Sequence, residues 1–181
     1  IAAFDPNGVG QEGPLFGLPF EEAHARVVII PVPWEVTVSY GAGTARGPQA
    51  ILEASPQLDY GDVDIKDAWQ LGLSMRPISQ AWLAKSDGLR AKTARYITEL
   101  EQGTQVDPQH PTVREVNEAA EALATWLRAE VQSVLGVGKI PLVLGGDHSS
   151  PLGAIQALAA QYPQFGILQI DAHADLRQAY E

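Results

Sequence analysis

Two short runs of Asp and His near the end of the chain contain residue types that bind metal ions. The first is 145–150, with the sequence GGDHSS, and the second is 171–177, with the sequence DAHADLR. Each run directly follows a hydrophobic stretch that predicts a buried β-strand. Because ligands in an open parallel sheet collect at the carboxyl ends of the strands, we expect His148 and Asp171 to meet at one metal site.

Three candidate ligands, Asp171, His173 and Asp175, alternate with small or apolar residues in the second run. On an extended backbone all three point to the same side, about 6.6 Å apart, so the array spans about 13 Å. Metal–ligand distances of about 2 Å are too short for one ion to bind such an array. The segment therefore either curls or binds two ions with Asp171 or another carboxylate as a bridge. Two ions together would lower the pKa of a shared water and stabilise a tetrahedral intermediate.

Simpler interpretations of the two runs exist. Asp147 could cap a helix, and Ser149 or Ser150 could be the N-cap of a helix entered through Pro151. Two such runs, each directly after a predicted buried strand, are nevertheless hard to explain as turns and caps alone. A serine hydrolase fits less well because the first run lacks the Gly-x-Ser-x-Gly pattern. In an Asp-x-His metallophosphatase, the Asp/His run would open the domain.

Composition limits the partners and the metal. The 181 residues carry 12 Lys and Arg against 22 Asp and Glu, a formal net charge of −10, which argues against a nucleic-acid partner and suits a small cationic substrate. There is no cysteine, so a metal must be bound through nitrogen and oxygen, and carboxylates mixed with imidazole favour manganese or a similar divalent ion, with nickel also able to bind. No apolar run is long enough to span a bilayer and no leader pattern is evident, so we expect a cytoplasmic protein without membrane contact.

Hydrophobic patterning predicts an α/β fold with a parallel sheet covered by helices. We expect residues 1–25 to form an irregular arm of the kind that often packs on a neighbouring subunit, and a Gly-rich loop over 34–48. Thr112 and Glu115 would form a capping box, whereas His110 is expected to be solvated. The predicted strands are 26–31, 58–63, 69–75, 140–144 and 165–170, and the predicted helices are 48–55, 81–101, 112–135 and 151–161.

The two runs resemble the ureohydrolase family, which includes agmatinase and arginase. Residues 33–35, 39–44 and 47–51 add to the likeness and are similar to its agmatinase-like branch. The resemblance implies a three-layer α/β/α sandwich with a central parallel sheet, incomplete at the C-terminus. Residues 26–181 would then be the N-terminal part of a single domain that cleaves a guanidino C–N bond and releases urea.

The resemblance also implies a binuclear manganese site. His148 and Asp175 would bind one ion, His173 would bind the other, and Asp171 would bridge both. The family's remaining ligands lie in a later Asp-x-Asp run, and its proton-shuttling His is also expected downstream of Glu181. We therefore expect the 181-residue piece alone not to turn over substrate, and no catalytic residue within it beyond the metal ligands.

The predicted activity is that of an agmatinase, which converts agmatine to putrescine and urea. Another ureohydrolase (guanidinase, guanidinobutyrase or arginase), a zinc deacetylase-like amidohydrolase and an inactive relative that acts as a partner or scaffold are the alternatives. Trp34 or Tyr40 could stack on the planar cation, or each could be an ordinary packed loop aromatic. The family also leads us to expect a homo-oligomer, a trimer or a hexamer.

Overall fold

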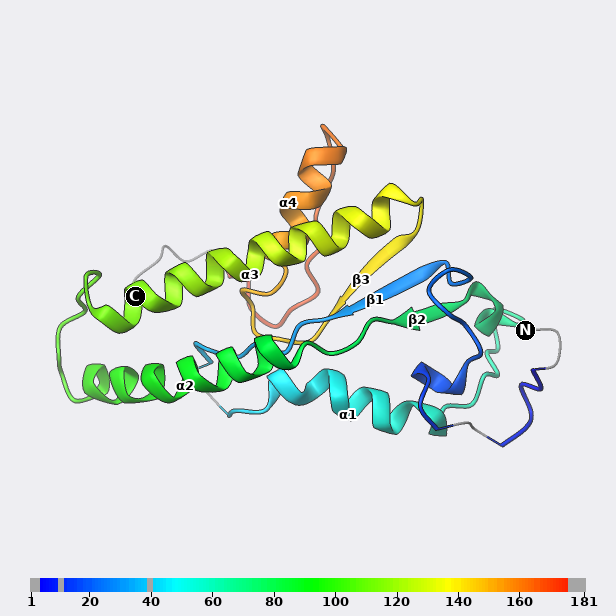
Figure 1. The fold of residues 1–181 in the computed structure, drawn as a ribbon, viewed down its shortest axis with the longest axis horizontal. Helices are drawn as coiled ribbons and strands as arrows, with labels where there is room; N and C mark the ends of the chain where they lie inside the picture. Colours follow the sequence, from blue (N-terminus) through cyan, green and yellow to red (C-terminus); the bar gives the residue numbers. More distant parts are fainter. Residues whose placement is uncertain (1–3, 10–11, 39–40, 176–181) are drawn as a thin grey trace.

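The computed structural model describes residues 4–9, 12–38 and 41–175 of the chain. The described residues form three β-strands, four α-helices and four short 3₁₀ helices (Figure 1). In chain order the elements are η1 (Leu15–Gly17), β1 (Val27–Pro31), η2 (Thr44–Arg46), α1 (Gly47–Ala54), η3 (Ser55–Gln57), η4 (Ala68–Leu71), β2 (Leu73–Met75), α2 (Gln80–Glu101), α3 (Pro111–Gly136), β3 (Ile140–Leu144) and α4 (Leu152–Gln161).

The three strands form one parallel sheet in the order β2-β1-β3. Central strand β1 pairs Val27 with Leu73 on one side and with Ile140 on the other. All five residues of β1 are buried, as its continuous run of apolar side chains predicts. The predicted parallel sheet is confirmed.

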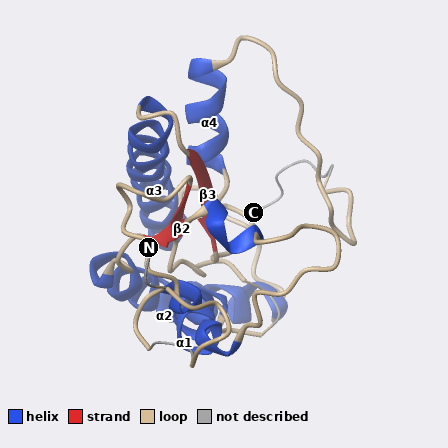
Figure 2. Cartoon of the chain, turned by 90° about the vertical axis from the view of Figure 1, so that its right-hand side faces the viewer, coloured by secondary structure: helices blue, strands red, loops and turns tan. Residues whose placement is uncertain are grey.

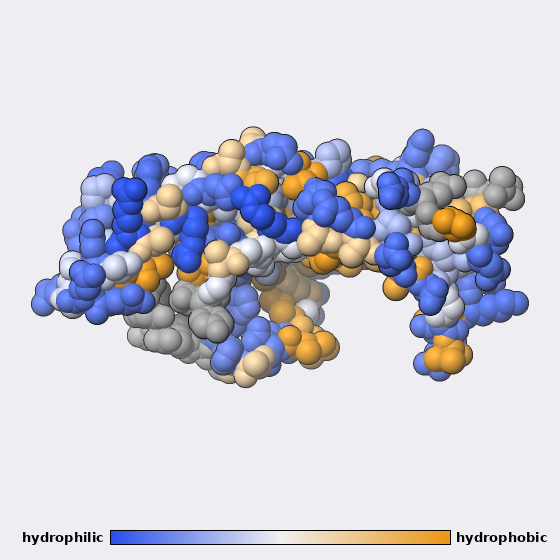
Figure 3. Space-filling view, turned by 90° about the horizontal axis from the view of Figure 1, so that it is seen from below, coloured by the Kyte–Doolittle hydropathy of each residue, from blue (hydrophilic) through white to orange (hydrophobic). Residues whose placement is uncertain are grey.

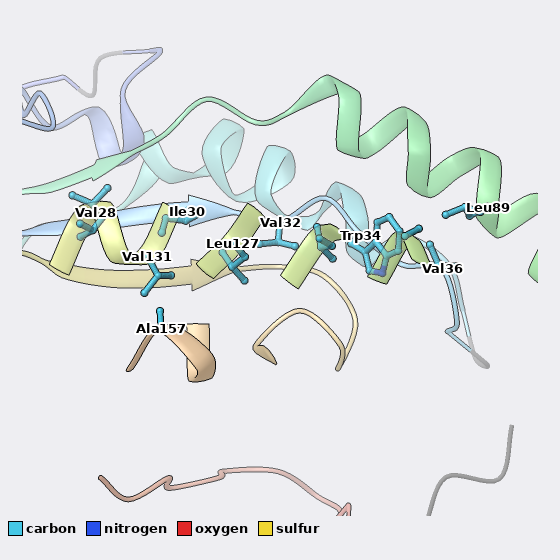
Figure 4. Close-up of a cluster of buried hydrophobic side chains, with 12 residues drawn as sticks. Val28, Ile30, Val32, Trp34, Val36, Leu89, Leu127, Val131 and Ala157 are labelled. Atoms are coloured by element: carbon cyan, nitrogen blue, oxygen red, sulfur yellow. The ribbon is translucent and has the colours of Figure 1, made fainter. Parts of the chain in front are cut away.

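Helices cover both faces of β1, because its side chains alternate between the two faces. Val28 and Ile30 point into a core that α3, α2 and α4 complete, and this core continues past the strand through Val32, Trp34 and Val36 (Figure 4). On the opposite face, side chains from η1 and α1 pack against the alternate positions of β1, and the partly buried side chains of β2 join them. The expected three-layer α/β/α arrangement is therefore confirmed.

Helix α3 begins differently from the prediction. His110 is the N-cap and its Nδ1 accepts a hydrogen bond from the Thr112 amide at 3.2 Å, while Pro111 occupies the first turn. The predicted capping box is wrong, because Glu115 instead pairs with Lys92 of α2 at 2.6 Å. The predicted solvation of His110 is also wrong, since its ring stacks on Tyr96 with 4.3 Å between the centroids.

The predicted strand 165–170 does not form. After α4 the chain runs as an exposed loop that does not join the sheet (Figure 2), and Ile167 and Ile170 are 66% and 91% exposed. β3 is consequently an edge strand, and its Leu142 is 41% exposed rather than buried as predicted. An apolar run indicates a capacity for burial, but pairing also requires covering layers on both faces of the added strand.

The other edge of the sheet also differs in detail. Residues 58–63 form no strand, and only Leu73–Met75 of the predicted strand 69–75 pairs, because η4 takes up the residues before it. In the N-terminal stretch, Leu15 and Leu18 pack on the chain's own core and are 4% and 2% exposed, whereas Val9 is 97% exposed.

The face of the molecule drawn in Figure 3 is largely polar. Seen from below, most side chains are hydrophilic, with separate hydrophobic groups among them (Figure 3). None of the helices in the described ranges combines the length and the hydropathy that a membrane crossing requires.

Candidate metal centre

The loop that carries His148 leaves the end of β3 in tight contact with the rest of the fold. Gly145 and Gly146 have φ angles of +88° and +87°, which L side chains rarely adopt. A Cβ at Gly145 would lie 2.6 Å from Pro48 Cγ, and a Cβ at Gly146 would lie 3.1 Å from the Val32 carbonyl oxygen. The glycine pair therefore lets the His148 loop pass close to α1 and to the chain that follows β1.

Asp147 orients the turn at His148. Its Oδ1 accepts hydrogen bonds from the Ser149 amide at 3.1 Å and the Ser149 hydroxyl at 2.5 Å. Helix α4 starts after Pro151 without a side-chain cap, so neither Ser149 nor Ser150 is its N-cap. The local bonds of Asp147 close a turn and leave the His148 side chain 76% exposed.

The second run curls instead of remaining extended. The His173 amide donates to Asp171 Oδ1 at 2.8 Å, and Asp175 adopts a left-handed φ of +50°. Gln169 Nε2 donates to Asp175 Oδ2 at 3.1 Å. The spacing of Asp171, His173 and Asp175 allows either a curled segment or an extended one that binds two ions. The described structure has the curled form.

This curl brings both carboxylates of the second run to His148. His148 Nε2 lies 3.4 Å from Asp171 Oδ2, and its Nδ1 lies 3.0 Å from Asp175 Oδ2. One ligand atom from each of the three residues can be chosen so that all lie within 4.8 Å of one another. The second oxygen of Asp171 lies 3.6 Å from His173 Nδ1, so this carboxylate sits between two imidazoles.

The donor set fits a divalent metal ion. Two carboxylates and an imidazole converge from sequence positions 23 to 27 residues apart, and these are groups that bind divalent ions in proteins. Nitrogen and oxygen donors without thiolate suit manganese and similar ions. The convergence of His148 and Asp171 follows the sequence prediction, although Asp171 arrives on a loop rather than on a strand.

Comparison with protein families matches residues 25–181 to the arginase family. The chain belongs to the arginase family. The ureohydrolase resemblance is thereby confirmed, and the family match favours it over the deacetylase-like alternative.

Several curated arginase-family proteins are similar to this chain. The N(1)-aminopropylagmatine ureohydrolase of Synechocystis is 30% identical over 162 residues, covering 88% of this chain and 43% of the relative. An agmatinase of Bacillus anthracis is 30% identical over 162 residues, covering 90% and 44%. An arginase of Bacillus caldovelox is 40% identical over 75 residues, covering 41% and 24%. No solved structure matches the chain significantly.

The chain is shorter than the curated relatives that it matches. It spans 43% of the length of the Synechocystis relative and 44% of the agmatinase.

The two aromatic candidates for substrate contact have different outcomes. Trp34 is only 1% exposed and packs edge-on against Trp82 at 5.9 Å between ring centroids, so the structure places it in the core and not at an entrance. Trp34 is therefore an ordinary packed aromatic, the second of the two possibilities given above. It is packed because the chain after β1 continues along the core formed by α2 and α3. Tyr40 lies outside the described residues.

The polar residues that fix the loop after β1 are not predicted by the sequence patterns described above. Glu35 is 6% exposed, and the hydroxyls of Ser86 and Thr93 on α2 bind the backbone of the same loop. A carboxylate inside an apolar segment was the available signal for Glu35. The two hydroxyls on α2 carry no comparable signal, because Ser and Thr are common on solvated helix faces.

Proposed function

We propose that the protein is a metal-dependent ureohydrolase that cleaves a guanidino C–N bond and releases urea. The observation that carries the proposal is the convergence of His148, Asp171 and Asp175 in a chain of the arginase family. The chain spans under half the length of its relatives, so the proposal concerns the whole protein.

For the cofactor we propose two manganese ions. His148 and Asp175 would hold one ion, His173 would hold the other, and Asp171 would contribute an oxygen to each. The position of Asp171 between the two imidazoles supports this division. When bound, such ions supply Lewis acidity that lowers the pKa of water and stabilises negative charge in the transition state.

The chain's own residues support a cationic substrate. The formal net charge of −10 over the 181 residues raises the local concentration of cations, whereas the Asp171 and Asp175 carboxylates are assigned to the metal ions. Gln169 holds the Asp175 carboxylate through a 3.1 Å hydrogen bond and thereby keeps its ligand oxygen oriented.

Agmatine is the proposed substrate, and putrescine and urea are the products. Relatives named as agmatinase and as N(1)-aminopropylagmatine ureohydrolase support a decarboxylated guanidino compound over arginine. The match to arginases covers a smaller share of this chain, 41% for the Bacillus caldovelox protein. Guanidinase and guanidinobutyrase activities are the alternatives within the family.

The test is a urea assay on the full-length protein loaded with Mn²⁺. Agmatine, N(1)-aminopropylagmatine, arginine, 4-guanidinobutyrate and guanidine are offered separately, and agmatine should give the highest kcat/KM. His148→Ala should abolish urea release, whereas the matched control His24→Ala, at an exposed position outside the site, should leave it unchanged. Failure of the wild-type protein to release urea from any of these compounds would refute the proposal.

The assembly and the compartment form a separate part of the proposal. We expect a cytoplasmic homo-oligomer, a trimer or a hexamer, in keeping with the family resemblance. Light scattering after size-exclusion chromatography measures the first, and cell fractionation measures the second. A monomer at micromolar concentration would contradict the proposed assembly.

A further inference from the structure

Glu35 is a buried carboxylate in the loop that is hydrogen-bonded to the His148 loop, and it is not one of the candidate ligands. It is 6% exposed, and its Oε2 accepts hydrogen bonds from the amides of Gly43 at 2.6 Å and Ala45 at 3.0 Å. Burying a carboxylate is costly unless hydrogen bonds replace its water, and bonds to a charged acceptor are about twice as strong as neutral ones. The Glu35 side chain therefore defines the shape of the turn at 43–45.

The backbone around Glu35 is itself fixed by α2. The Glu35 amide donates to the hydroxyl of Ser86 at 3.0 Å, and Ser86 is fully buried. The hydroxyl of Thr93, about two turns further along the same face of α2, donates to the Val36 carbonyl at 2.6 Å. The two helix hydroxyls hold the backbone, so the carboxylate reaches the turn from a position set by the hydrophobic core.

The turn and the backbone both continue to the metal-binding loop. The Thr44 hydroxyl donates to the Gly146 carbonyl at 3.1 Å, and the Asp147 amide donates to the Trp34 carbonyl at 2.9 Å. Both residues that precede His148 are therefore connected to Glu35. Asp147 is bonded to Trp34, the residue before Glu35, and Gly146 is bonded to Thr44, in the turn that the Glu35 carboxylate holds.

We infer that Glu35 is a positioning residue of the metal centre. Its carboxylate holds the 43–45 turn against the Gly146 carbonyl, and this contact fixes the backbone that presents His148. The inference rests on the proposed function to the extent that His148 binds a metal ion. The coupling between the two loops can be measured without any metal.

Two mild substitutions test the inference in the full-length protein. Glu35→Gln keeps the shape of the side chain and removes its charge, and Thr44→Val removes the bond to the Gly146 carbonyl while keeping the volume. We expect the Mn²⁺ Kd to rise about tenfold in Glu35→Gln, the size typical of residues that orient a ligand, and about threefold in Thr44→Val. Free Mn²⁺ is followed by electron paramagnetic resonance during the titration.

A second readout is independent of the metal. Hydrogen exchange of the metal-free protein should speed up at 145–148 in both variants, because the Asp147 amide is bonded to this loop. The two residues act in one chain of contacts, so the double variant should bind Mn²⁺ no more weakly than Glu35→Gln alone. Glu99→Gln, the same charge change at an exposed position of α2, is the matched control and should change neither readout.

The outcomes separate this inference from the proposed function. If Glu35→Gln lowers the thermal stability but leaves both the Mn²⁺ Kd and the exchange at 145–148 at wild-type values, Glu35 is merely structural and the inference is wrong. If the wild-type protein binds no Mn²⁺, the proposed metal function fails. In that case faster exchange at 145–148 in Glu35→Gln still supports the loop coupling, and unchanged exchange refutes it.

Discussion

His148 and Asp171 belong to one group of candidate ligands, but the chain holds them by different means. The His148 loop leaves a paired strand, passes close to Pro48 and Val32, and is hydrogen-bonded to the buried loop after β1. The run from Asp171 to Asp175 follows twelve consecutive exposed residues, 159–170, and its described hydrogen bonds are local ones. One half of the site is anchored to the core, and the other half is a turn on an exposed segment.

This difference indicates how the two halves respond to an ion. Ligands on an anchored backbone are pre-organised, so binding orders few of their groups. Ligands on an exposed segment lose conformational freedom when they bind, which reduces the net affinity. We therefore expect the ion to order the 171–175 run far more than the His148 loop.

The largest expected effect comes from changing Asp171, the candidate ligand that lies between the two imidazoles. Asp171→Asn should weaken Mn²⁺ binding by more than the roughly 100-fold that outer-shell residues can contribute, and should affect both ions. Calorimetric titration measures affinity and stoichiometry. Asp64→Asn, at an exposed position outside the site, should bind like the wild type. Two sites that still fill after Asp171→Asn would exclude its bridging role.

The anchored half depends on the close approach of α4 to α3. A Cβ at Gly153 would lie 2.4 Å from the Ala124 carbonyl oxygen and 2.9 Å from Leu127 Cβ, so Gly153→Ala should lower the free energy of unfolding by about 2 kcal/mol. Gly88→Ala, in open space within α2, should instead raise it by up to about 1 kcal/mol. Urea denaturation measures both. Equal effects from the two changes would show that the packing of α4 does not limit stability.

Metal binding should slow hydrogen exchange in the 171–175 run far more than in the half of the site that is anchored to the core. At an Mn²⁺ concentration ten times the Kd, amides at 171–175 should exchange about tenfold more slowly than in the metal-free protein, whereas amides in β3 should change little. Exchange measured by mass spectrometry, with EDTA to reverse the effect, is the check. Equal slowing in both segments would mean that the His148 loop is no better anchored than the Asp171 run.

The smallest expected effect on stability concerns the ion pairs that Arg76 forms with Glu22 and Glu130. Arg76 binds the Glu22 carboxylate through two nitrogens at 2.6 and 3.0 Å and also reaches Glu130 on α3. The hydrogen bonds from Arg76 lower the pKa of Glu22 below its ordinary value of 4.5. The stability from this pairing is therefore present above pH 4.5 and is lost as the pH falls through the lower pKa of the folded state.

Glu22→Gln tests this pH dependence. Because the Glu22 side chain is 42% exposed, the change should cost only about 0.5 kcal/mol at pH 7, and the cost should vanish in strong acid. Chemical denaturation at several pH values measures it, with the exposed Glu121→Gln as control. A loss that persists undiminished in acid would assign the role of Glu22 to packing instead of charge.

The amino-acid sequence by itself determined the elements whose pattern is local and strong. The apolar run at β1, the three- and four-residue spacing along α3 and the Asp/His runs after two hydrophobic stretches predict the central strand, the long helix and the group of candidate metal ligands. Each of these depends on residues near one another in the chain. The family resemblance added the three-layer fold.

Tertiary structure decided the rest, because burial and pairing depend on partners far away in the chain. Trp34 is in the core because Trp82 and α3 surround it, and Glu35 can be buried because amides eight and ten residues later bind its carboxylate. The apolar run at 165–170 looks like β1 in sequence, yet it is exposed because a strand buried on both faces needs covering layers that local sequence cannot provide. The curl that joins Asp175 to His148 likewise depends on a hydrogen bond at Asp171 and a left-handed residue, which alternation alone does not specify.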